Sequence, residues 1–275
     1  MGIRITRGCS MEHTYISLGG GCDVAMNLNA IGFRKKSYPF DWLWNLDSGL
    51  TSVTNIIRHD FSEVLKEGAY QNTKHYRFSS NVITYEHYPS IAHIHTDPLN
   101  NIDEHEKLCR RSLSFIQKLN DTSIKHFVYY RSFNEGSFKD STLSCQDSFN
   151  ILVSEGTRFL DMLYKKFPKS KSKVTLLLVL QVDPANYAMA KKLTREFRST
   201  KLANEYPCIR VGCTYTRDDK NSYLVARWKM QWLNLLLNQT ETPIRYRLLK
   251  CSAYAFRSVS RLLSKLFRKT ICEKR

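Results

Sequence analysis

The chain has 275 residues, of which 42 are Lys or Arg and 25 are Asp or Glu, so its formal net charge is +17. Hydrophobic residues make up 42% and aromatic residues 12%, which is enough apolar material for a folded core and excludes a disordered chain. No run of about 18 uncharged apolar residues occurs, which argues against a membrane-spanning helix. No apolar segment follows the basic start, so a secretory signal is not expected.

Strand-like and helix-like segments alternate along most of the chain. Short β-prone runs predict strands, and apolar residues at helical spacing predict helices. We expect strands at residues 14–18, 126–130, 174–182 and 208–215. We expect helices at residues 22–31, 104–119, 148–167, 187–197 and 223–237.

This alternation predicts an α/β fold built from right-handed βαβ crossovers. The segment 174–182 is apolar on both sides of the pleat, so helices are expected on both faces of a mostly parallel sheet, in three layers. Residues 1–243 are predicted to form one α/β domain. The alternation breaks down at about 37–101, where aromatic residues, prolines and five histidines cluster, and we interpret this region as an irregular insertion with a hairpin around 76–88.

The first predicted strand ends in Gly19-Gly20-Gly21, and Cys22 follows directly at the start of a predicted helix. Ligands of open α/β sheets bind beyond the carboxyl ends of the strands, and glycines let a ligand approach the backbone closely. A thiolate at a helix N-terminus is stabilised by free N–H groups and the helix dipole. Cys22 is therefore a candidate nucleophile, and the glycines are candidate oxyanion or ligand-binding residues.

Two alternatives for this glycine turn stay open. It is either a plain tight turn with a buried small residue, or a cradle for a phosphate or another anion. The sequence contains neither the dinucleotide motif G-x-G-x-x-G nor a P-loop at this position.

The longer segment 16–42 reads I-S-L-G-G-G-C-D-V-A-M-N-L-N-A-I-G-F-R-K-K-S-Y-P-F-D-W. It resembles the bacterial and viral family described as "putative papain-like cysteine peptidase", with its S-L-G-x-x-C and S-x-P-F-D-W motifs. Weaker similarity continues through Arg110-Arg111 and Phe115 to the helix that carries Trp228 and Trp232. The resemblance implies a Cys–His pair with Cys22 as nucleophile. It also implies a papain-like α+β fold, which is the alternative to the parallel α/β fold.

A nucleophilic thiol needs a base within hydrogen-bond reach. His87, at the end of a β-prone run, is the candidate base, with His93 and His95 as rivals. Members of the family often carry His-Asp at this position, whereas Tyr88 stands here in place of the acid. His93 and His95, expected to face the same way, together with Asp97 resemble part of a metal site, but a third and fourth clear ligand are lacking. No metal and no cofactor are therefore predicted.

Three further charged residues are candidates for the site. Asp41 either orients a histidine or substrate, or caps a helix that starts at Trp42. Asp183 follows the most apolar strand and is either a site acid or, next to Pro184, part of a turn. Arg131, after the strand at 126–130, either binds an anionic substrate or is solvated.

Other residues have alternative roles as well. Trp228 and Trp232 share one helix face and either pack in the core or form a sugar-stacking platform. His59-Asp60 is expected at a helix start. The eight cysteines form no C-x-x-C pair, which favours reduced thiols in a cytosolic compartment.

Residues 244–275 hold ten Lys or Arg against the single acidic residue Glu273. Apolar residues recur at helical spacing within 245–269, which predicts a basic amphipathic helix. Such a helix either binds an anionic membrane surface or packs on the body. Nucleic acid is not expected as a partner, because no motif that reads DNA or RNA accompanies the charge.

The sequence thus predicts a thiol-dependent hydrolase or acyl transferase in the cytoplasm, peripheral at the membrane, with Cys22 as nucleophile and His87 as base. The alternative is a non-covalent ligand-binding or glycan-assembly accessory protein at the cytoplasmic membrane face. Its glycine turn would hold a sugar nucleotide or another anionic ligand. The substrate and the oligomeric state are not predicted.

Overall fold

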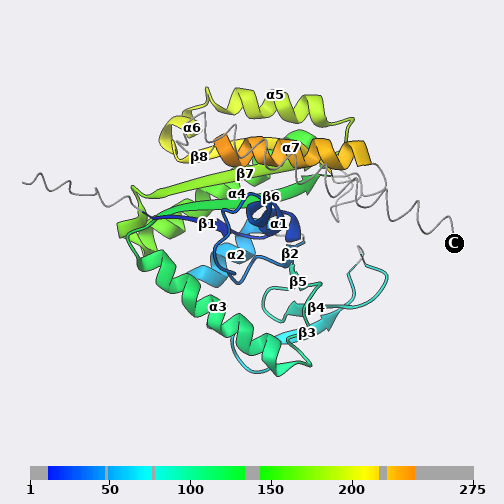
Figure 1. The fold of residues 1–275 in the computed structure, drawn as a ribbon, viewed down its shortest axis with the longest axis vertical. Coiled ribbons are helices and arrows are strands. Elements are labelled where there is room, and N and C mark those ends of the chain that lie inside the picture. The colour runs from blue at the N-terminus through cyan, green and yellow to red at the C-terminus, as the bar shows by residue number, and fades with distance from the viewer. Residues whose placement is uncertain (1–11, 47–48, 76–77, 134–142, 217–221, 239–275) are drawn as a thin grey trace, which may run out of the picture.

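The computed structural model describes residues 12–46, 49–75, 78–133, 143–216 and 222–238. These residues form two four-stranded sheets with helices around them (Figure 1). The strands are β1 (His13–Ser17), β2 (Leu43–Asn45), β3 (Tyr70–Thr73), β4 (Val82–Tyr85), β5 (Ile91–His93), β6 (Ile124–Phe133), β7 (Val174–Val182) and β8 (Ile209–Tyr215). The helices are α1 (Cys22–Ala30), α2 (Gly49–Arg58), α3 (Ile102–Asn120), α4 (Cys145–Lys166), α5 (Tyr187–Phe197), α6 (Lys201–Glu205) and α7 (Ser222–Asn238), with a 3₁₀ turn at Pro168–Ser170.

The larger sheet has the strand order β1-β6-β7-β8, and each neighbouring pair is parallel. All four strands were predicted, and β7 has the predicted bounds. The observed β6 is longer than predicted, because Ser132 and Phe133 still pair with Gln181 and Val182 of β7. The parallel α/β prediction is confirmed.

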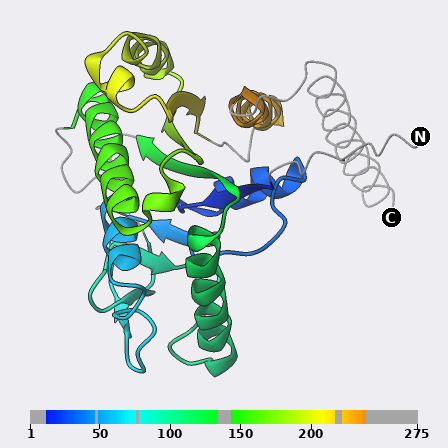
Figure 2. The same ribbon diagram turned by 90° about the vertical axis from the view of Figure 1, so that its left-hand side faces the viewer.

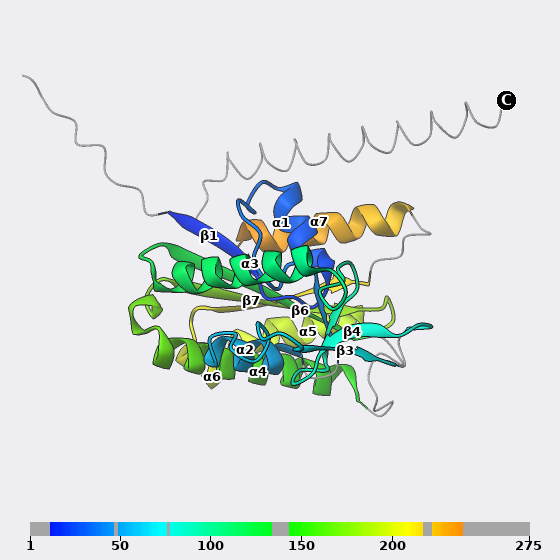
Figure 3. The ribbon, with the colours of Figure 1, turned by 90° about the horizontal axis from the view of Figure 1, so that it is seen from below.

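Helices cover both faces of the parallel sheet, as Figure 3 shows with α1 and α7 on one side and α2 and α4 on the other. On the α1/α7 face, Trp228 and Trp232 are buried against a cluster that includes Tyr130 and Val179. The two tryptophans are therefore core residues. On the opposite face, α4 and α5 pack against side chains such as Leu178 from the other side of the pleat. This arrangement confirms the three layers.

The region 37–101, predicted to be an irregular insertion, contains α2 and the second sheet. That sheet is antiparallel, with strand order β2-β5-β4-β3 (Figures 1 and 2). The predicted hairpin exists, but it consists of β3 and β4, where Tyr70 pairs with Tyr85. Tyr70, Tyr85 and Ile91 belong to the same core cluster as the parallel sheet, so the insertion shares the core of the main domain.

The long helix α4 is positioned by its sequence at two points. It begins with a capping box, in which the Ser144 hydroxyl accepts from the Asp147 N–H and the Asp147 carboxylate accepts from the Ser144 N–H. In its middle, a Cβ on Gly156 would lie 2.5 Å from a methyl carbon of Leu178. Glycine therefore lets α4 approach β7 closely, as required for the helix to cover this face.

The basic helix predicted within 244–275, and with it the boundary at 243, lies outside the described residues. Within the described part of the chain, no helix combines the length and the hydropathy that crossing a membrane requires.

Four aromatic rings stack in a row beside β1 and β6. The ring centroids lie 4.2 Å apart for Phe33 and Tyr15, 4.5 Å for Tyr15 and His126, and 5.1 Å for His126 and His13. One ring nitrogen of His126 lies 2.7 Å from the Thr175 hydroxyl, and the other lies 2.8 Å from His13. Burial, followed by the charge of His13, lowers the pKa of His126 to about 4. The folded state therefore favours the neutral form of the His126 imidazole over the protonated form.

We expect the protein to lose stability as the pH falls from about 6.5 toward 4, because the unfolded state binds a proton that folded His126 excludes. Within this window each such histidine contributes a slope of about 1.4 kcal/mol per pH unit. The His126→Gln variant should show a smaller decline in urea unfolding experiments at pH 7, 6 and 5. His95→Gln, at an exposed position, is the matched control and should keep the wild-type slope. Equal slopes in all three proteins would contradict the assignment of this pH dependence of stability to His126.

Candidate functional site

The glycine turn connects β1 to α1. After β1, the Leu18 N–H still donates to the Val128 carbonyl at 2.8 Å, and the chain then turns through three glycines. Their φ angles are +89° at Gly19, +98° at Gly20 and +154° at Gly21, all of which L side chains rarely adopt. Cys22 is the first residue of α1 and is half-buried. The sequence motif thus forms the predicted strand, turn and helix.

The glycines are also required by the close approach of neighbouring groups. A Cβ on Gly20 would overlap the backbone oxygen of Tyr130, and one on Gly21 would overlap the hydroxyl of the same tyrosine. A Cβ on Gly19 would overlap the side-chain oxygen of Asn45. Tyr130 of β6 and Asn45 of β2 therefore form the walls against which the turn packs.

The turn carries backbone donors directly before Cys22 in the chain. The Gly19 N–H donates to the Ser17 hydroxyl at 3.2 Å. In the ranges that the structure describes, no acceptor contacts the N–H of Gly20 or of Gly21. Because the N–H groups in the first turn of a helix lack intrahelical partners, the start of α1 adds to this set of donors. The arrangement suits an oxyanion or another small anion.

Asn45 connects the glycine turn to the antiparallel sheet. Its side-chain N–H₂ donates to the Leu18 carbonyl at 3.3 Å and to the Gly49 carbonyl at 3.4 Å. The residue is 7% exposed, and its Oδ1 has no hydrogen-bond partner in the described part of the chain. The turn, the end of β2 and the start of α2 are thus tied together at one buried amide.

Arg131 points to the other face of β6 and forms a buried pair with Glu155 of α4. Its guanidinium lies 3.6 Å from the Glu155 carboxylate, and the two side chains are 6% and 4% exposed. Glu155 also accepts from the Thr51 hydroxyl at 2.9 Å and from the Leu50 and Thr51 N–H groups at 3.4 Å. The solvated alternative for Arg131 is wrong, since the residue is buried against an internal carboxylate.

Glu155 was not predicted from the sequence, because no motif surrounds it. Burial raises its pKa, and the nearby Arg131 opposes that rise. It caps the N-terminus of α2 from another helix, which satisfies donors that α2 cannot satisfy itself. Its spacing in the sequence could have indicated that it is buried. Glu155 lies three residues after Leu152 and four before Phe159, both buried on the same helix face.

His87 contacts an acid that the sequence did not identify. Its Nε2 lies 3.5 Å from the Glu63 carboxylate, and the imidazole is 56% exposed. The pair lines an open cavity of about 430 Å³ together with His59, Asp60, Ser62 and Tyr88. Neither Cys22 nor the glycines belong to the lining of this cavity. The structure thus gives His87 an acidic partner, and its approach to Cys22 stays a prediction.

The expected helix start at His59-Asp60 is wrong, because both residues follow the last residue of α2, Arg58. Asp60 instead pairs with Lys166 of α4 at 2.7 Å. It adopts a positive φ of 51°, which is consistent with the sharp change of direction at a helix C-terminus.

Asp41 is a buried structural acid. It accepts from the Arg34 Nε at 2.8 Å and from the Tyr38 N–H at 3.0 Å, and it is 1% exposed. Burial raises its pKa, and the charge of Arg34 counteracts that effect. The expectation of a helix starting at Trp42 is wrong, since β2 begins at Leu43.

Asp183 adopts the turn alternative. Its carboxylate accepts from the Asn186 N–H at 2.9 Å and from the Asn186 side chain, immediately before α5 begins at Tyr187.

His93 and His95 do not face the same environment, because His93 is buried and His95 is exposed. Burial lowers the pKa of His93 to about 3. No cluster of metal ligands occurs among the residues that the structure describes.

The fold and this turn define an α/β protein with a cysteine at a strand–glycine turn–helix junction. Residues 13–139, just under half of the chain, match the model of the family described as "Putative papain-like cysteine peptidase (DUF1796)". The resemblance predicted from residues 16–42 is thereby confirmed. The description agrees with the papain-like cysteine peptidase class, and it specifies neither an activity nor a nucleophile.

A curated relative is an uncharacterised protein of Acanthamoeba polyphaga mimivirus. It is 36% identical over 70 residues, which cover 24% of this chain and 30% of the mimivirus protein. No solved structure matches this chain.

Substituting Gly20 tests the geometry of the turn. Gly20→Ala places a methyl group against the Tyr130 backbone at a φ of +98°, so we expect a loss of about 2–3 kcal/mol in the free energy of unfolding. Gly68→Ala is the matched control, because Gly68 also has a positive φ, +76°, but no atom lies within 4 Å of its added Cβ. The control should lose only about 1 kcal/mol, as measured by urea unfolding. Equal losses in the two variants would contradict the close approach to Tyr130.

Proposed function

We propose that the protein is a thiol-dependent hydrolase or acyl transferase of the papain-like cysteine peptidase class, with Cys22 as the nucleophile. The observation that carries this proposal is the position of Cys22, the first residue of α1, directly after the glycine turn. A helix N-terminus stabilises a thiolate, and the same turn offers N–H groups to an acyl oxygen.

In the proposed reaction, the Cys22 thiolate attacks the acyl carbon of the substrate. The carbonyl oxygen gains negative charge and accepts from the Gly20 and Gly21 N–H groups. The tetrahedral intermediate collapses to a thioester, and the leaving group departs with the proton that the base took from the thiol. Water then hydrolyses the thioester in a hydrolase, and a second nucleophile takes the acyl group in a transferase.

His87 remains the proposed base. Its contact with Glu63 supports this role, since a carboxylate beside an imidazole fixes the tautomer and the orientation of the ring. Asp41 and Asp183 are engaged in a buried ion pair and in a turn, respectively, so in the proposed mechanism they position the backbone.

An acylation experiment tests the role of Cys22. Incubating the protein with p-nitrophenyl acetate near neutral pH should give an acetyl thioester that peptide mapping locates at Cys22. Cys22→Ala should lose the adduct and the release of p-nitrophenol. Cys109→Ser removes another half-buried thiol and should leave both unchanged. An adduct that persists in Cys22→Ala, or that maps to Cys109 in the wild type, would overturn the proposal.

The role of His87 is tested separately from that of Cys22. Removing a general base costs about 10²–10⁴ in rate, so His87→Ala should slow acylation by such a factor while the adduct still maps to Cys22. His95→Ala, at another exposed histidine, is the control. An unchanged rate in His87→Ala would remove this histidine from the mechanism and leave the nucleophile in place.

The open N–H groups of Gly20 and Gly21 favour one further candidate, the non-covalent binding of an anionic ligand such as a sugar nucleotide. A ligand that binds only the folded state raises the melting temperature. Equal stabilisation of wild type and Cys22→Ala by UDP-glucose, without any acyl adduct, would favour this second function. A cytoplasmic, membrane-peripheral location through residues 245–269 remains part of the proposal in either case.

A further inference from the structure

A second cavity lies at the amino end of β1, opposite to the glycine turn. Its volume is about 120 Å³, and its polar lining comes from Glu12, His13, Thr14, Lys35, Lys36, Tyr38 and Lys118. The stacked rings of Tyr15 and Phe33 form an apolar wall. Since β1 is five residues long, it separates this cavity from the glycine turn by about 16 Å.

The cavity carries a positive charge. Its lining holds three lysines and one carboxylate. Lys118 is paired with Asp121 and Glu12, so the positive charge available to a ligand comes from Lys35 and Lys36. Lys35 and Lys36 are exposed on the loop after α1, where a ligand can reach them. A surface of this charge attracts anions, and a doubly charged anion would balance it.

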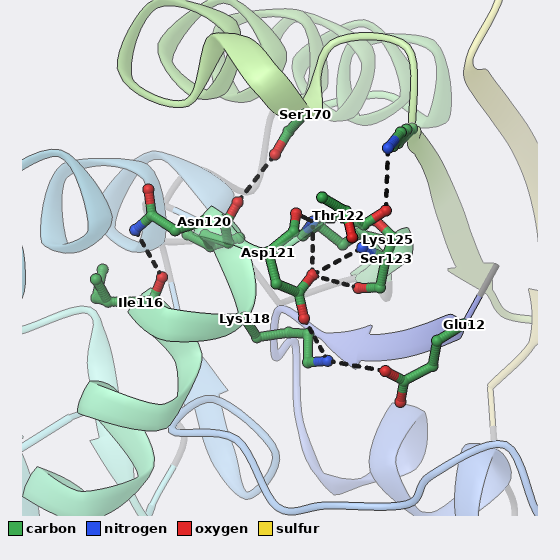
Figure 4. Close-up of polar contacts among 11 residues, drawn as sticks. Glu12, Ile116, Lys118, Asn120, Asp121, Thr122, Ser123, Lys125 and Ser170 are labelled. Carbon is green, nitrogen blue, oxygen red and sulfur yellow. Dashed lines mark hydrogen bonds and ion pairs between the residues drawn. The ribbon is translucent and has the colours of Figure 1, made fainter.

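Lys118 is held in place by a network that Figure 4 shows. Its ammonium lies 2.6 Å from the Asp121 carboxylate and 3.4 Å from Glu12, and the side chain is 14% exposed. Asp121 also accepts from the Ser123 hydroxyl at 2.6 Å and lies 3.2 Å from the fully buried ammonium of Lys125. These contacts fix the third lysine at the cavity, so only Lys35 and Lys36 need to adjust to a ligand.

Two hydroxyl groups at the cavity lack partners in the described part of the chain. Tyr38 is 2% exposed as a residue, and no hydrogen bond of its hydroxyl occurs among the described residues. The Thr14 hydroxyl is a buried polar atom without a hydrogen-bond partner. Burial raises the pKa of Tyr38 to about 12, so its hydroxyl remains a donor at neutral pH. Buried polar groups are normally satisfied, so the unpartnered Thr14 hydroxyl at a basic cavity is consistent with an acceptor-rich ligand. The Tyr38 hydroxyl provides a second donor at the same cavity.

We propose that this cavity binds a phosphate group, either as the free ion or as the head of a phosphomonoester. Lys35 and Lys36 neutralise the charge, and the hydroxyls of Tyr38 and Thr14 donate to the phosphate oxygens. The volume of about 120 Å³ accommodates a tetrahedral oxyanion. The rest of a monoester extends into solvent past the exposed Lys35 and Lys36.

Thermal unfolding with inorganic phosphate tests the proposal. For a dissociation constant of about 1 mM, about 10 mM phosphate at pH 7.5 should raise the melting temperature by about 3 °C over chloride at equal ionic strength. Lys35→Ala/Lys36→Ala should lose this shift, and so should Tyr38→Phe, which removes only the hydroxyl. The control Lys191→Ala/Lys192→Ala removes the same charge from exposed positions on α5 and should retain the full shift.

Two results would overturn the proposal: no stabilisation beyond that of chloride, or the same stabilisation in all variants.

Binding to lipid vesicles distinguishes a lipid headgroup from a soluble phosphate as the source of the phosphate group. A preference for phosphatidic acid over phosphatidylglycerol at equal surface charge, lost in Tyr38→Phe, assigns the site to a lipid headgroup. Stabilisation by inorganic phosphate and glycerol 3-phosphate without a lipid preference assigns it to a soluble ligand. Both assignments support the phosphate site.

Discussion

The absence of side chains at Gly19, Gly20 and Gly21 is the constraint on which the rest of the structure depends. The backbone of this turn lies against Tyr130 of β6 and Asn45 of β2 so closely that a Cβ at any of the three positions would overlap a neighbouring atom. This contact fixes where α1 begins relative to the parallel sheet. Through the two carbonyls that Asn45 binds, it also fixes the antiparallel sheet and the start of α2. One tight turn thus sets the position of the cysteine and of both sheets.

The regular parts of the fold could be predicted because each carries its own periodic pattern. The strand at 174–182 and the helix at 187–197 have the predicted bounds, since a continuous apolar run and a helical stripe are both strong signals. The antiparallel sheet was missed because strands such as β2 and β5 have only three residues, too few to show an alternation. Their pairing depends on partners distant in the sequence, which local patterns do not show.

The part of the candidate site that forms a contiguous motif could be predicted, and the acids that join it through the fold could not. Cys22 and the glycines form a contiguous motif whose backbone requirements are evident from residue type. Glu155 and Glu63 are single acids within longer segments, and their partners Arg131 and His87 become neighbours only through the fold. A parallel sheet also differs from the α+β fold that a papain-like description implies. The class of chemistry and the architecture therefore have to be argued separately.

The order of strands in the parallel sheet has a consequence for how the protein folds. The first strand pairs with one that follows it by more than a hundred residues, since His13 lies opposite Ile124. During synthesis the segment from His13 to Ala30 therefore has no sheet to join until β6 has emerged. Contacts of such long sequence separation slow folding and expose unpaired backbone edges in the meantime. The nascent chain is thus most vulnerable to aggregation and proteolysis while the segment from β1 to α1 is still unpaired.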